Sequence, residues 1–241
     1  ANAQKRAFTI EDLYRVKGVS SVSLSPDGKT VCYTASSSDL KNQKSGSDIY
    51  IMNADGSHAK ALTEDGKSSS AVWSKDGKSI FFTNYEKGTA QIFRMDLTTC
   101  ETEQVTDYEL GIGSPVISPD ERYIAFTAEV YPDLGADAKA NKARMEKKEQ
   151  GPVQAHIADK LLYRHWTSYN DGRCNHLILF DTHTKTYKDL TPGNYSLIFV
   201  VGGGITYQFS PDSKEICFVS NHDEHQEAST NADLWTVSVN G

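Results

Sequence analysis

The chain has 241 residues, a formal net charge of −7 and 38% hydrophobic residues. The excess of acidic residues argues against a surface that binds nucleic acid or anionic membrane. No apolar run approaches the roughly 20 residues that a membrane-spanning helix needs, whereas the length is sufficient for a substantial core.

The first residues predict a short lead-in to the fold. Thr9 followed by Asp12 is typical of a capping box, which predicts a helix over 10–16 within a lead-in segment over 1–18. No hydrophobic targeting segment precedes it, so either a signal peptide has been removed or none existed. A first strand is then predicted over 19–24.

Four copies of one tight turn divide the rest of the chain. They are Ser25-Pro26-Asp27-Gly28, Ser74-Lys75-Asp76-Gly77, Ser118-Pro119-Asp120-Glu121 and Ser210-Pro211-Asp212-Ser213. Proline fixes φ at about −65° at the second position, aspartate suits the third, and glycine takes the positive φ that follows. Each copy precedes a short β-rich run, so each is predicted to be a hairpin turn, although the last two copies lack the glycine.

Two further repeated sequence patterns complete the unit. A third strand is predicted at 48–52, 91–95, 176–180 and 233–237, and a closing strand ending in Leu-Thr or Val-Thr at 61–63, 104–106 and 189–191. The turns begin at residues 25, 74, 118 and 210, at intervals of 49, 44 and 92 residues. A period of roughly 40–50 residues with several short strands indicates a β-propeller blade.

The predicted fold is therefore all-β, a partial β-propeller over 19–241 with about four four-stranded blades. The blades are predicted at approximately 19–66, 67–110, 111–196 and 197–241. The last blade is expected to be incomplete, because no fourth strand follows Asn240-Gly241. We expect these residues to form part of a larger ring, and the unpaired edge to favour self-association.

Long connections are expected on one face of this propeller. A polar loop over 36–47, an insertion over 130–160 and a loop over 221–232 all join the second strand of a blade to the third. In repeat architectures, a face decorated in this way usually binds the ligand or partner.

The insertion in the third blade has its own predicted structure. Residues 136–150 contain strong helix formers and few large apolar residues, which predicts a solvated helix. Its basic residues, Lys139, Lys142, Arg144, Lys147 and Lys148, suit a solvated face better than an anion site. Segments 161–166 and 175–181 predict a hairpin around a turn at 170–172. A degenerate extra blade is the alternative for this long interval.

Candidate binding residues lie in two of these connections. Arg164 could bind a carboxylate or carbonyl and Trp166 could stack on a ligand. The alternative is a core tryptophan beside an arginine paired with an acid. Asp223, Glu224 and Glu227 could attract the free amino terminus of a peptide, or they could simply form a solubilising loop.

Motifs for catalysis or metal binding are not found in the sequence. It contains no Gly-x-Ser-x-Gly elbow, no Cys-x-x-Cys pair and no phosphate loop. We interpret Gly202-Gly203-Gly204 as a link between blades rather than a phosphate cradle, and His222 and His225 as solvated residues rather than metal ligands. Cys32 and Cys217 are interpreted as buried thiols, with a disulfide as the alternative. No catalytic residue, metal or cofactor is predicted.

Three stretches, together with the repeated turns, resemble a known family. They are Phe8-Thr9-Ile10-Glu11-Asp12-Leu13; Tyr163-Arg164-His165-Trp166 with His176-Leu177 and Asp189-Leu190-Thr191-Pro192-Gly193; and Ser229-Thr230-Asn231-Ala232-Asp233-Leu234-Trp235. The turns resemble the Pro-Asp (PD40) propeller repeat shared by TolB and by peptidases of the prolyl oligopeptidase family. The three stretches resemble the amino-terminal regions of its dipeptidyl peptidase 5 and acylaminoacyl-peptidase-like members.

This resemblance implies a seven- or eight-bladed propeller that caps an α/β-hydrolase domain with a Ser-Asp-His triad. The propeller would restrict entry to short peptides and help to anchor their amino terminus, while none of the triad can be assigned to this chain. The expected location is periplasmic or secreted, with the cytoplasm as the alternative. The alternative function is a TolB-like propeller that binds a protein partner and has no enzyme attached. A glycan-binding propeller is less favoured, because the aromatic residues mostly fall at strand positions.

Overall fold

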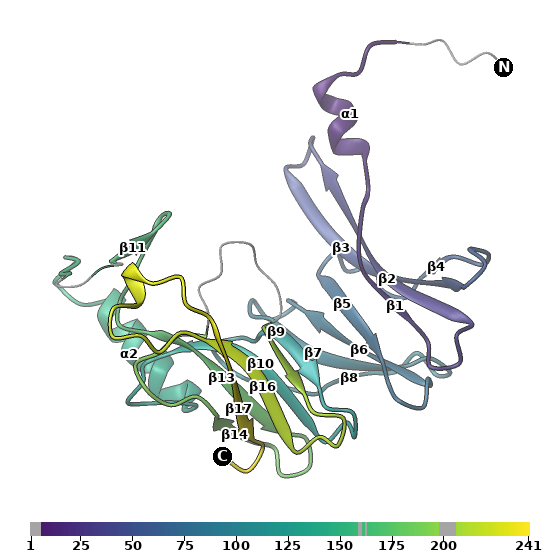
Figure 1. The fold of residues 1–241 in the computed structure, drawn as a ribbon. Helices are drawn as coiled ribbons and strands as arrows, with labels where there is room; N and C mark the ends of the chain where they lie inside the picture. The colour runs from purple at the N-terminus through teal and green to yellow at the C-terminus, as the bar shows by residue number, and fades with distance from the viewer. Residues whose placement is uncertain (1–5, 159–160, 162, 198–205) are drawn as a thin grey trace. The chain divides into compact units, whose positions relative to one another are not determined.

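The chain folds into two compact units, Ala1–Thr106 and Asp107–Gly241 (Figure 1). The structure is a computed structural model that describes residues 6–158, 161, 163–197 and 206–241. The predicted link at 202–204 lies outside the described residues. No described helix is long and apolar enough to cross a membrane.

Unit 1 contains a short helix and two four-stranded antiparallel sheets. Helix α1 spans Ile10–Arg15, close to the predicted 10–16, and its Thr9–Asp12 capping box is present. The strands are β1 (Gly18–Leu24), β2 (Thr30–Asp39), β3 (Lys44–Asn53), β4 (Lys60–Ala61), β5 (Ser68–Trp73), β6 (Ser79–Asn84), β7 (Gln91–Asp96) and β8 (Thr102–Gln104). They pair in chain order as β1-β2-β3-β4 and β5-β6-β7-β8, so each sheet is one propeller blade.

Unit 2 contains two further blades and the large insertion. Its elements are β9 (Gly113–Ile117), β10 (Tyr123–Val130), α2 (Ala138–Glu149), β11 (Arg164–His165), β12 (Ser168–Tyr169), β13 (Cys174–Asp181), β14 (Thr186–Asp189), β15 (Tyr207–Phe209), β16 (Glu215–Ser220), the 3-10 helix η1 (Gln226–Ala228) and β17 (Asp233–Ser238). One sheet has four strands in the order β14-β13-β10-β9, and the last has three in the order β15-β16-β17. The predicted all-β propeller is confirmed, and its last blade has three strands among the described residues.

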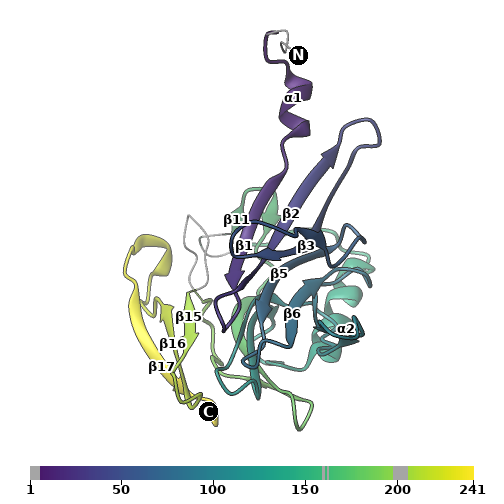
Figure 2. The same cartoon turned by 90° about the vertical axis from the view of Figure 1, so that its right-hand side faces the viewer.

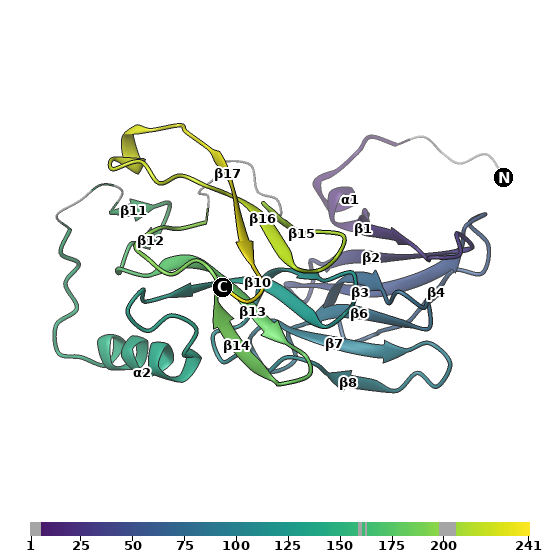
Figure 3. The same cartoon turned by 60° about the horizontal axis from the view of Figure 1, so that its bottom comes forward.

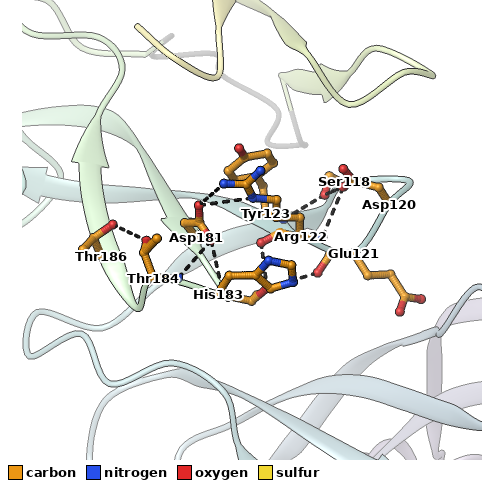
Figure 4. Close-up of polar contacts among 10 residues, drawn as sticks. Ser118, Asp120, Glu121, Arg122, Tyr123, Asp181, His183, Thr184 and Thr186 are labelled. Carbon is orange, nitrogen blue, oxygen red and sulfur yellow. Dashed lines mark hydrogen bonds and ion pairs between the residues drawn. The ribbon is translucent and has the colours of Figure 1, made fainter.

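The repeated turn has the same hydrogen bonds in all four copies. In the third copy (Figure 4), the Ser118 hydroxyl donates to Asp120 Oδ1 over 2.6 Å and accepts a bond from the Tyr123 amide over 2.9 Å. The Arg122 amide donates to the same aspartate oxygen. Corresponding bonds form in the other three copies. The serine and aspartate therefore satisfy the backbone amides of the turn. This explains why both residues are present in all four copies, whereas proline and glycine are not.

The fourth position of the turn requires a positive φ. Gly28 and Gly77 adopt φ values of 72° and 69°, whereas Glu121 and Ser213 both adopt 62°. A left-handed conformation costs a residue with a Cβ roughly 1–2 kcal/mol, and glycine avoids most of this cost. We therefore expect Glu121→Gly to raise the free energy of unfolding by about 1 kcal/mol, as measured by urea denaturation.

Ser213→Gly is the matched comparison for this prediction. The Ser213 hydroxyl accepts a hydrogen bond from the Asp120 amide over 3.1 Å, which joins the turns of the two blades in unit 2. Removing the hydroxyl should offset the relief of backbone strain, so the gain should be smaller than for Glu121→Gly. Equal gains from the two substitutions would show that this hydrogen bond contributes nothing to the free energy of unfolding.

A β-bulge recurs in the first strand of three blades. Ser21, Ser70 and Ser114 have φ values of 51°, 56° and 46°, and the pairing register shifts beside each of them. Each serine lies four residues before the first serine of the repeated turn. A bulge bends its strand and increases the local twist. The repeat alone did not reveal this feature, because serine carries no strong signal for a positive φ.

The predicted loop over 36–47 is wrong. Strands β2 and β3 continue pairing through Ser36↔Ser47 to Asp39↔Lys44, which leaves only residues 40–43 as the connection. Figure 2 shows this hairpin reaching beyond the start of β1. The first pair between β1 and β2 is Gly18↔Ser36. The polar composition therefore reflected solvent exposure of an extended hairpin, not the end of its strands.

The predicted hairpin between 161–166 and 175–181 is also wrong. Strand β13 pairs along its whole length with β10, from Tyr123↔Asp181 to Val130↔Cys174. Strand β11 pairs instead with β12 in a two-residue ladder. The long interval thus contains, among its described residues, a helix and a small hairpin in place of the alternative extra blade. The repeat had placed 176–180 as the third strand of this blade, which is confirmed, whereas sequence proximity suggested a hairpin with 161–166 that does not form.

Helix α2 confirms the predicted solvated helix. Its one buried residue is Asn141, which accepts a hydrogen bond from the Tyr131 amide over 2.6 Å and donates to the Gly135 carbonyl over 3.0 Å. Arg144 pairs with Asp133 on the surface. The helix is therefore fixed to the end of β10 by one amide side chain and surface ion pairs, not by an apolar face.

Each unit has a core shared by its two blades. In unit 1 the cluster comprises Cys32, Ile49, Ala71, Ile80, Phe82 and Met95. In unit 2 a larger cluster includes Leu177, Leu179, Leu190, Phe209, Ile216 and Phe218. Cys32 is buried and Cys217 partly buried, and both are free thiols. The interpretation as a buried thiol is confirmed for Cys32, whereas Cys217 is only partly buried.

Candidate functional site

One end of unit 2 contains a cavity of about 830 Å³. Its walls come from the insertion between β10 and β13, the link after β14, and the connection between β16 and β17. Figures 1 and 3 show α2, the β11–β12 hairpin and the β16–β17 connection at this same end. The lining residues include His156, Tyr163, Asn170, Tyr195, Asp223 and Glu224. The prediction that such connections gather on one face is confirmed within this unit.

Two carboxylates from the β16–β17 connection form the acidic end of the cavity. Asp223 accepts hydrogen bonds from the Ser229 hydroxyl and, over 3.4 Å, from the Asn231 amide nitrogen. Its own backbone amide donates to Asn221 Oδ1 over 2.8 Å. Glu224 follows directly and is exposed. Within the described part of the chain neither carboxylate forms an ion pair, so this end can accept a cation.

A third carboxylate in the wall, Asp171, already has a partner. The Arg173 guanidinium lies 2.9 Å from Asp171 Oδ1, and Lys148 donates to the Asp171 carbonyl over 3.1 Å. Burial disfavours the charge on Asp171, but the bonds from Arg173 outweigh it and hold the pKa below its usual range. Asp171 therefore remains ionised and neutralised by Arg173, which leaves Asp223 and Glu224 as the carboxylates able to bind a ligand.

Aromatic rings hold the acidic end in place. The His222 ring stacks between Tyr195 and Trp235, with centroid distances of 4.0 Å and 4.1 Å. His222 immediately precedes Asp223, so this stack limits the movement of the backbone that carries the carboxylate. Stacked aromatic pairs contribute about 0.5–1.5 kcal/mol beyond the area they bury.

A buried ion pair lies behind the link that carries Tyr195. His176 has no exposed surface; its Nδ1 lies 2.7 Å from Asp189 Oδ2 and its Nε2 lies 2.9 Å from the Gly193 carbonyl oxygen. Burial opposes protonation of the imidazole, but Asp189 and the carbonyl outweigh it and raise the pKa of His176 to about 9. A Cβ at Gly193 would lie 3.0 Å from the Tyr195 ring. The ion pair thus helps to hold the Gly193 backbone close to the Tyr195 ring, which is the first ring of the stack.

Comparison with known proteins identifies the fold family. The profile of the TolB beta propeller domain, PD40, matches residues 9–149, more than half of the chain. The chain belongs to the PD40 family of TolB β-propellers.

The relatives of this PD40 chain include a peptidase of known name. Dipeptidyl-peptidase 5 of Porphyromonas gingivalis is 30% identical over 239 residues, covering 96% of this chain and 34% of that protein. Among solved structures, Pyrococcus horikoshii acylaminoacyl peptidase aligns at 17% identity with a TM-score of 0.64, covering 93% of this chain and 31% of that one. TolB of Acinetobacter baumannii aligns at 18% identity with a TM-score of 0.53, covering 90% and 42%. The PD40 chain therefore spans about a third of the length of its curated peptidase relative.

The PD40 chain places its predicted site residues in two locations. Asp223 and Glu224 line the cavity, whereas Arg164 and Trp166 belong to the β11–β12 hairpin and are not among the lining residues. Trp166 is 83% exposed, so the alternative of a core tryptophan is wrong. Glu227 lies in η1, but its side chain falls outside the described part of the structure.

Several lining residues of the PD40 cavity were missed by sequence reasoning. Tyr195 follows β14 with no motif of its own, and His156 and Ile157 lie in a segment without periodicity. The sequence predicted Lys148 on a solvated helix face and a turn at 170–172, but did not place either at a cavity. The signal that could have found these residues is topological, because connections on one propeller face meet regardless of their sequence.

The PD40 chain shows no arrangement typical of a metal centre in its described residues. No group of three or more His, Cys, Asp or Glu side chains there is placed to hold a metal ion. The His222 ring is instead packed between two aromatic rings.

Proposed function

We propose that this PD40 chain is the propeller part of a serine exopeptidase of the dipeptidyl-peptidase or acylaminoacyl-peptidase type. In this role its cavity receives the free amino terminus of a short peptide. The observation that carries the proposal is the cavity of about 830 Å³ with Asp223 and Glu224 at one end. An α-ammonium group is the cation that such carboxylates bind through charge-assisted hydrogen bonds.

The length of the chain relative to the peptidase supports its assignment as one part of a larger protein. The chain aligns over nearly its whole length with dipeptidyl-peptidase 5 but accounts for 34% of that protein. We assign the chemistry to an α/β-hydrolase domain of the same parent protein, with its own nucleophile and triad. The propeller then limits access to short peptides and positions their amino terminus. A cavity of this volume falls within the range of about 300–1,000 Å³ that small-molecule sites occupy.

A binding experiment on the chain tests this role. The dipeptide Phe-Ala is titrated calorimetrically at pH 7 into the wild type and into Asp223→Asn and Glu224→Gln. Each substitution should weaken binding about tenfold, because a charge-assisted bond to the ammonium becomes a neutral one. Acetylation of the peptide amino terminus should weaken binding of the wild type at least as much.

Glu215→Gln is the matched control, since Glu215 is an exposed carboxylate at the start of β16 and does not line the cavity. It should leave the affinity unchanged. Equal binding of free and acetylated peptide would contradict amino-terminal recognition. Failure of every free dipeptide to bind would favour the other candidate role, a TolB-like module that binds a protein partner.

A further inference from the structure

The Asp223 carboxylate is held by two side chains that follow it in the β16–β17 connection. The Ser229 hydroxyl donates to Asp223 Oδ2, and Asn231 Nδ2 lies 3.4 Å from Asp223 Oδ1. Neither Ser229 nor Asn231 is among the described residues that line the cavity. Their effect on a ligand in the cavity therefore passes through Asp223, not through a contact of their own.

The Ser229 hydroxyl has a defined direction. The backbone amide of Asn231 donates to Ser229 Oγ over 3.0 Å. An ionised carboxylate can only accept hydrogen bonds, so the single hydroxyl proton goes to Asp223. Ser229 is partly buried and lies six residues after Asp223 in the chain. The bond therefore joins the beginning of the connection to its end.

The Asn231 side chain joins the same carboxylate to the sheet. Its Nδ2 lies 2.9 Å from Asp233 Oδ2, and Asp233 is the first residue of β17. Asp233 is paired with Ser220 of β16. One amide group thus contacts both Asp223 and a residue fixed by strand pairing, which limits the movement of the Asp223 side chain.

We propose that Ser229, assisted by Asn231, is a positioning residue that orients the Asp223 carboxylate for the peptide ammonium before the peptide binds. This inference rests on the proposed function, because it takes the ammonium as the ligand of Asp223. A carboxylate has about four lone-pair positions. The two bonds use about two of them and leave the others for the ammonium. Binding then avoids the loss of affinity that comes from ordering a free side chain.

Competition is the alternative effect of the same hydroxyl. In that case the Ser229 hydroxyl would occupy a position on Asp223 that the ammonium needs. The two effects have opposite signs, because removal of the hydroxyl weakens peptide binding if it positions the carboxylate and strengthens binding if it competes.

Substitutions at Ser229 test the proposal in the full chain. Phe-Ala is titrated calorimetrically at pH 7, and Ser229→Ala should bind it about three- to tenfold more weakly than the wild type. Ser229→Thr keeps the hydroxyl and should restore wild-type affinity, because the extended backbone of residue 229, with φ −119° and ψ 143°, suits a β-branched side chain.

Ser57→Ala is the matched control for the loss of a hydroxyl. The Ser57 hydroxyl donates to Asp55 Oδ1 over 2.6 Å in a turn of unit 1, so the substitution removes the same kind of bond away from the cavity. It should leave the affinity for Phe-Ala unchanged.

A double-mutant cycle shows whether Ser229 acts through the carboxylate. In the Asp223→Asn background, Ser229→Ala should weaken binding by less than about twofold, because the charge that it positions has been removed. A general effect on the connection would persist in that background. Circular dichroism spectra identify any variant that fails to fold. If Ser229→Ala is such a variant, Asn231→Ala decides, with an expected weakening of about two- to threefold.

The outcomes separate this inference from the proposed function. Wild-type preference for Phe-Ala over N-acetyl-Phe-Ala, with equal or tighter binding of Phe-Ala by Ser229→Ala, would overturn the positioning role and leave amino-terminal recognition intact. Equal losses from Ser229→Ala with and without Asp223→Asn would do the same. Equal binding of the two peptides by the wild type, or binding of neither, would overturn both.

Discussion

Replacing His176 by leucine is expected to lower the free energy of unfolding by roughly 3–5 kcal/mol, the usual cost of removing one partner of a buried ion pair. The imidazole is fully buried and touches both Asp189 and the Gly193 carbonyl. Leucine fills a similar volume but supplies neither hydrogen bond, so the largely buried Asp189 side chain loses its imidazole partner. Urea denaturation at pH 7 measures the loss.

The same pair predicts how stability changes with pH. Burial opposes the charge, but Asp189 outweighs it and raises the pKa of His176 from 6.5 to about 9 in the folded chain. The folded state then binds the proton more tightly than the unfolded state. The stabilisation is therefore complete below about pH 6.5 and is lost as the pH rises through about 9. A shift of this size corresponds to about 3 kcal/mol.

His176→Gln separates this effect from other titrations. Glutamine occupies the corresponding position of the second blade, Gln91, so it suits the backbone there and carries no titrating group. Unfolding free energies at pH 6, 8 and 10 should fall in the wild type by about 3 kcal/mol more than in the variant. The same pH dependence in both proteins would assign the stabilisation to other groups.

The repeat made the fold predictable because each copy carries the hydrogen bonds that build it. Ser118 and Asp120 satisfy the backbone of their turn in the same way as their counterparts in the other copies. Such contacts are local, so a four-residue pattern is enough to recognise them. The order of strands within a blade then follows from the short connections.

Only part of the candidate site could be predicted, because its residues come from segments that lie far apart in the sequence. Asp223 and Glu224 were identified by their charge, but the rings of Tyr195 and His156 reach the cavity through connections separated from them by several strands. No local pattern encodes that meeting. The same limitation produced the wrong hairpin between 161–166 and 175–181, although the repeat correctly placed 176–180 as the third strand of its blade, beside β10.

The closing strands show why the Leu-Thr echo exists. In each of three blades, the threonine hydroxyl accepts a hydrogen bond from an amide of the third strand. The pairs are Thr63 with Ile49, Thr106 with Ile92 and Thr191 with Leu177, at 3.0 Å, 2.9 Å and 2.9 Å. The side chain just before that amide is Asp48, Gln91 or His176. The first two accept a bond from the same hydroxyl, whereas His176 bonds with Asp189 instead.

This arrangement predicts a second large effect on the free energy of unfolding, from a substitution at Thr106. Thr106→Val keeps the shape of the side chain but removes the hydroxyl, which is buried and bonded to both the Ile92 amide and Gln91 Oε1. Each buried polar group that loses its partner costs about 1–3 kcal/mol. We therefore expect the free energy of unfolding to fall by roughly 2–4 kcal/mol, as measured by urea denaturation.

Two further substitutions show whether the hydroxyl or the side-chain volume is responsible. Thr106→Ser keeps the hydroxyl and removes one methyl group, so its cost should be near 1 kcal/mol. Thr102→Val makes the same chemical change as Thr106→Val at an exposed position of β8 and should be nearly neutral. Losses of equal size for valine and serine at position 106 would indicate that packing, not the bond to the third strand, fixes the closing strand. A large loss for valine alone would show that the hydroxyl bonds stabilise the blade just beyond the end of its fourth strand, in addition to the ladder between β7 and β8.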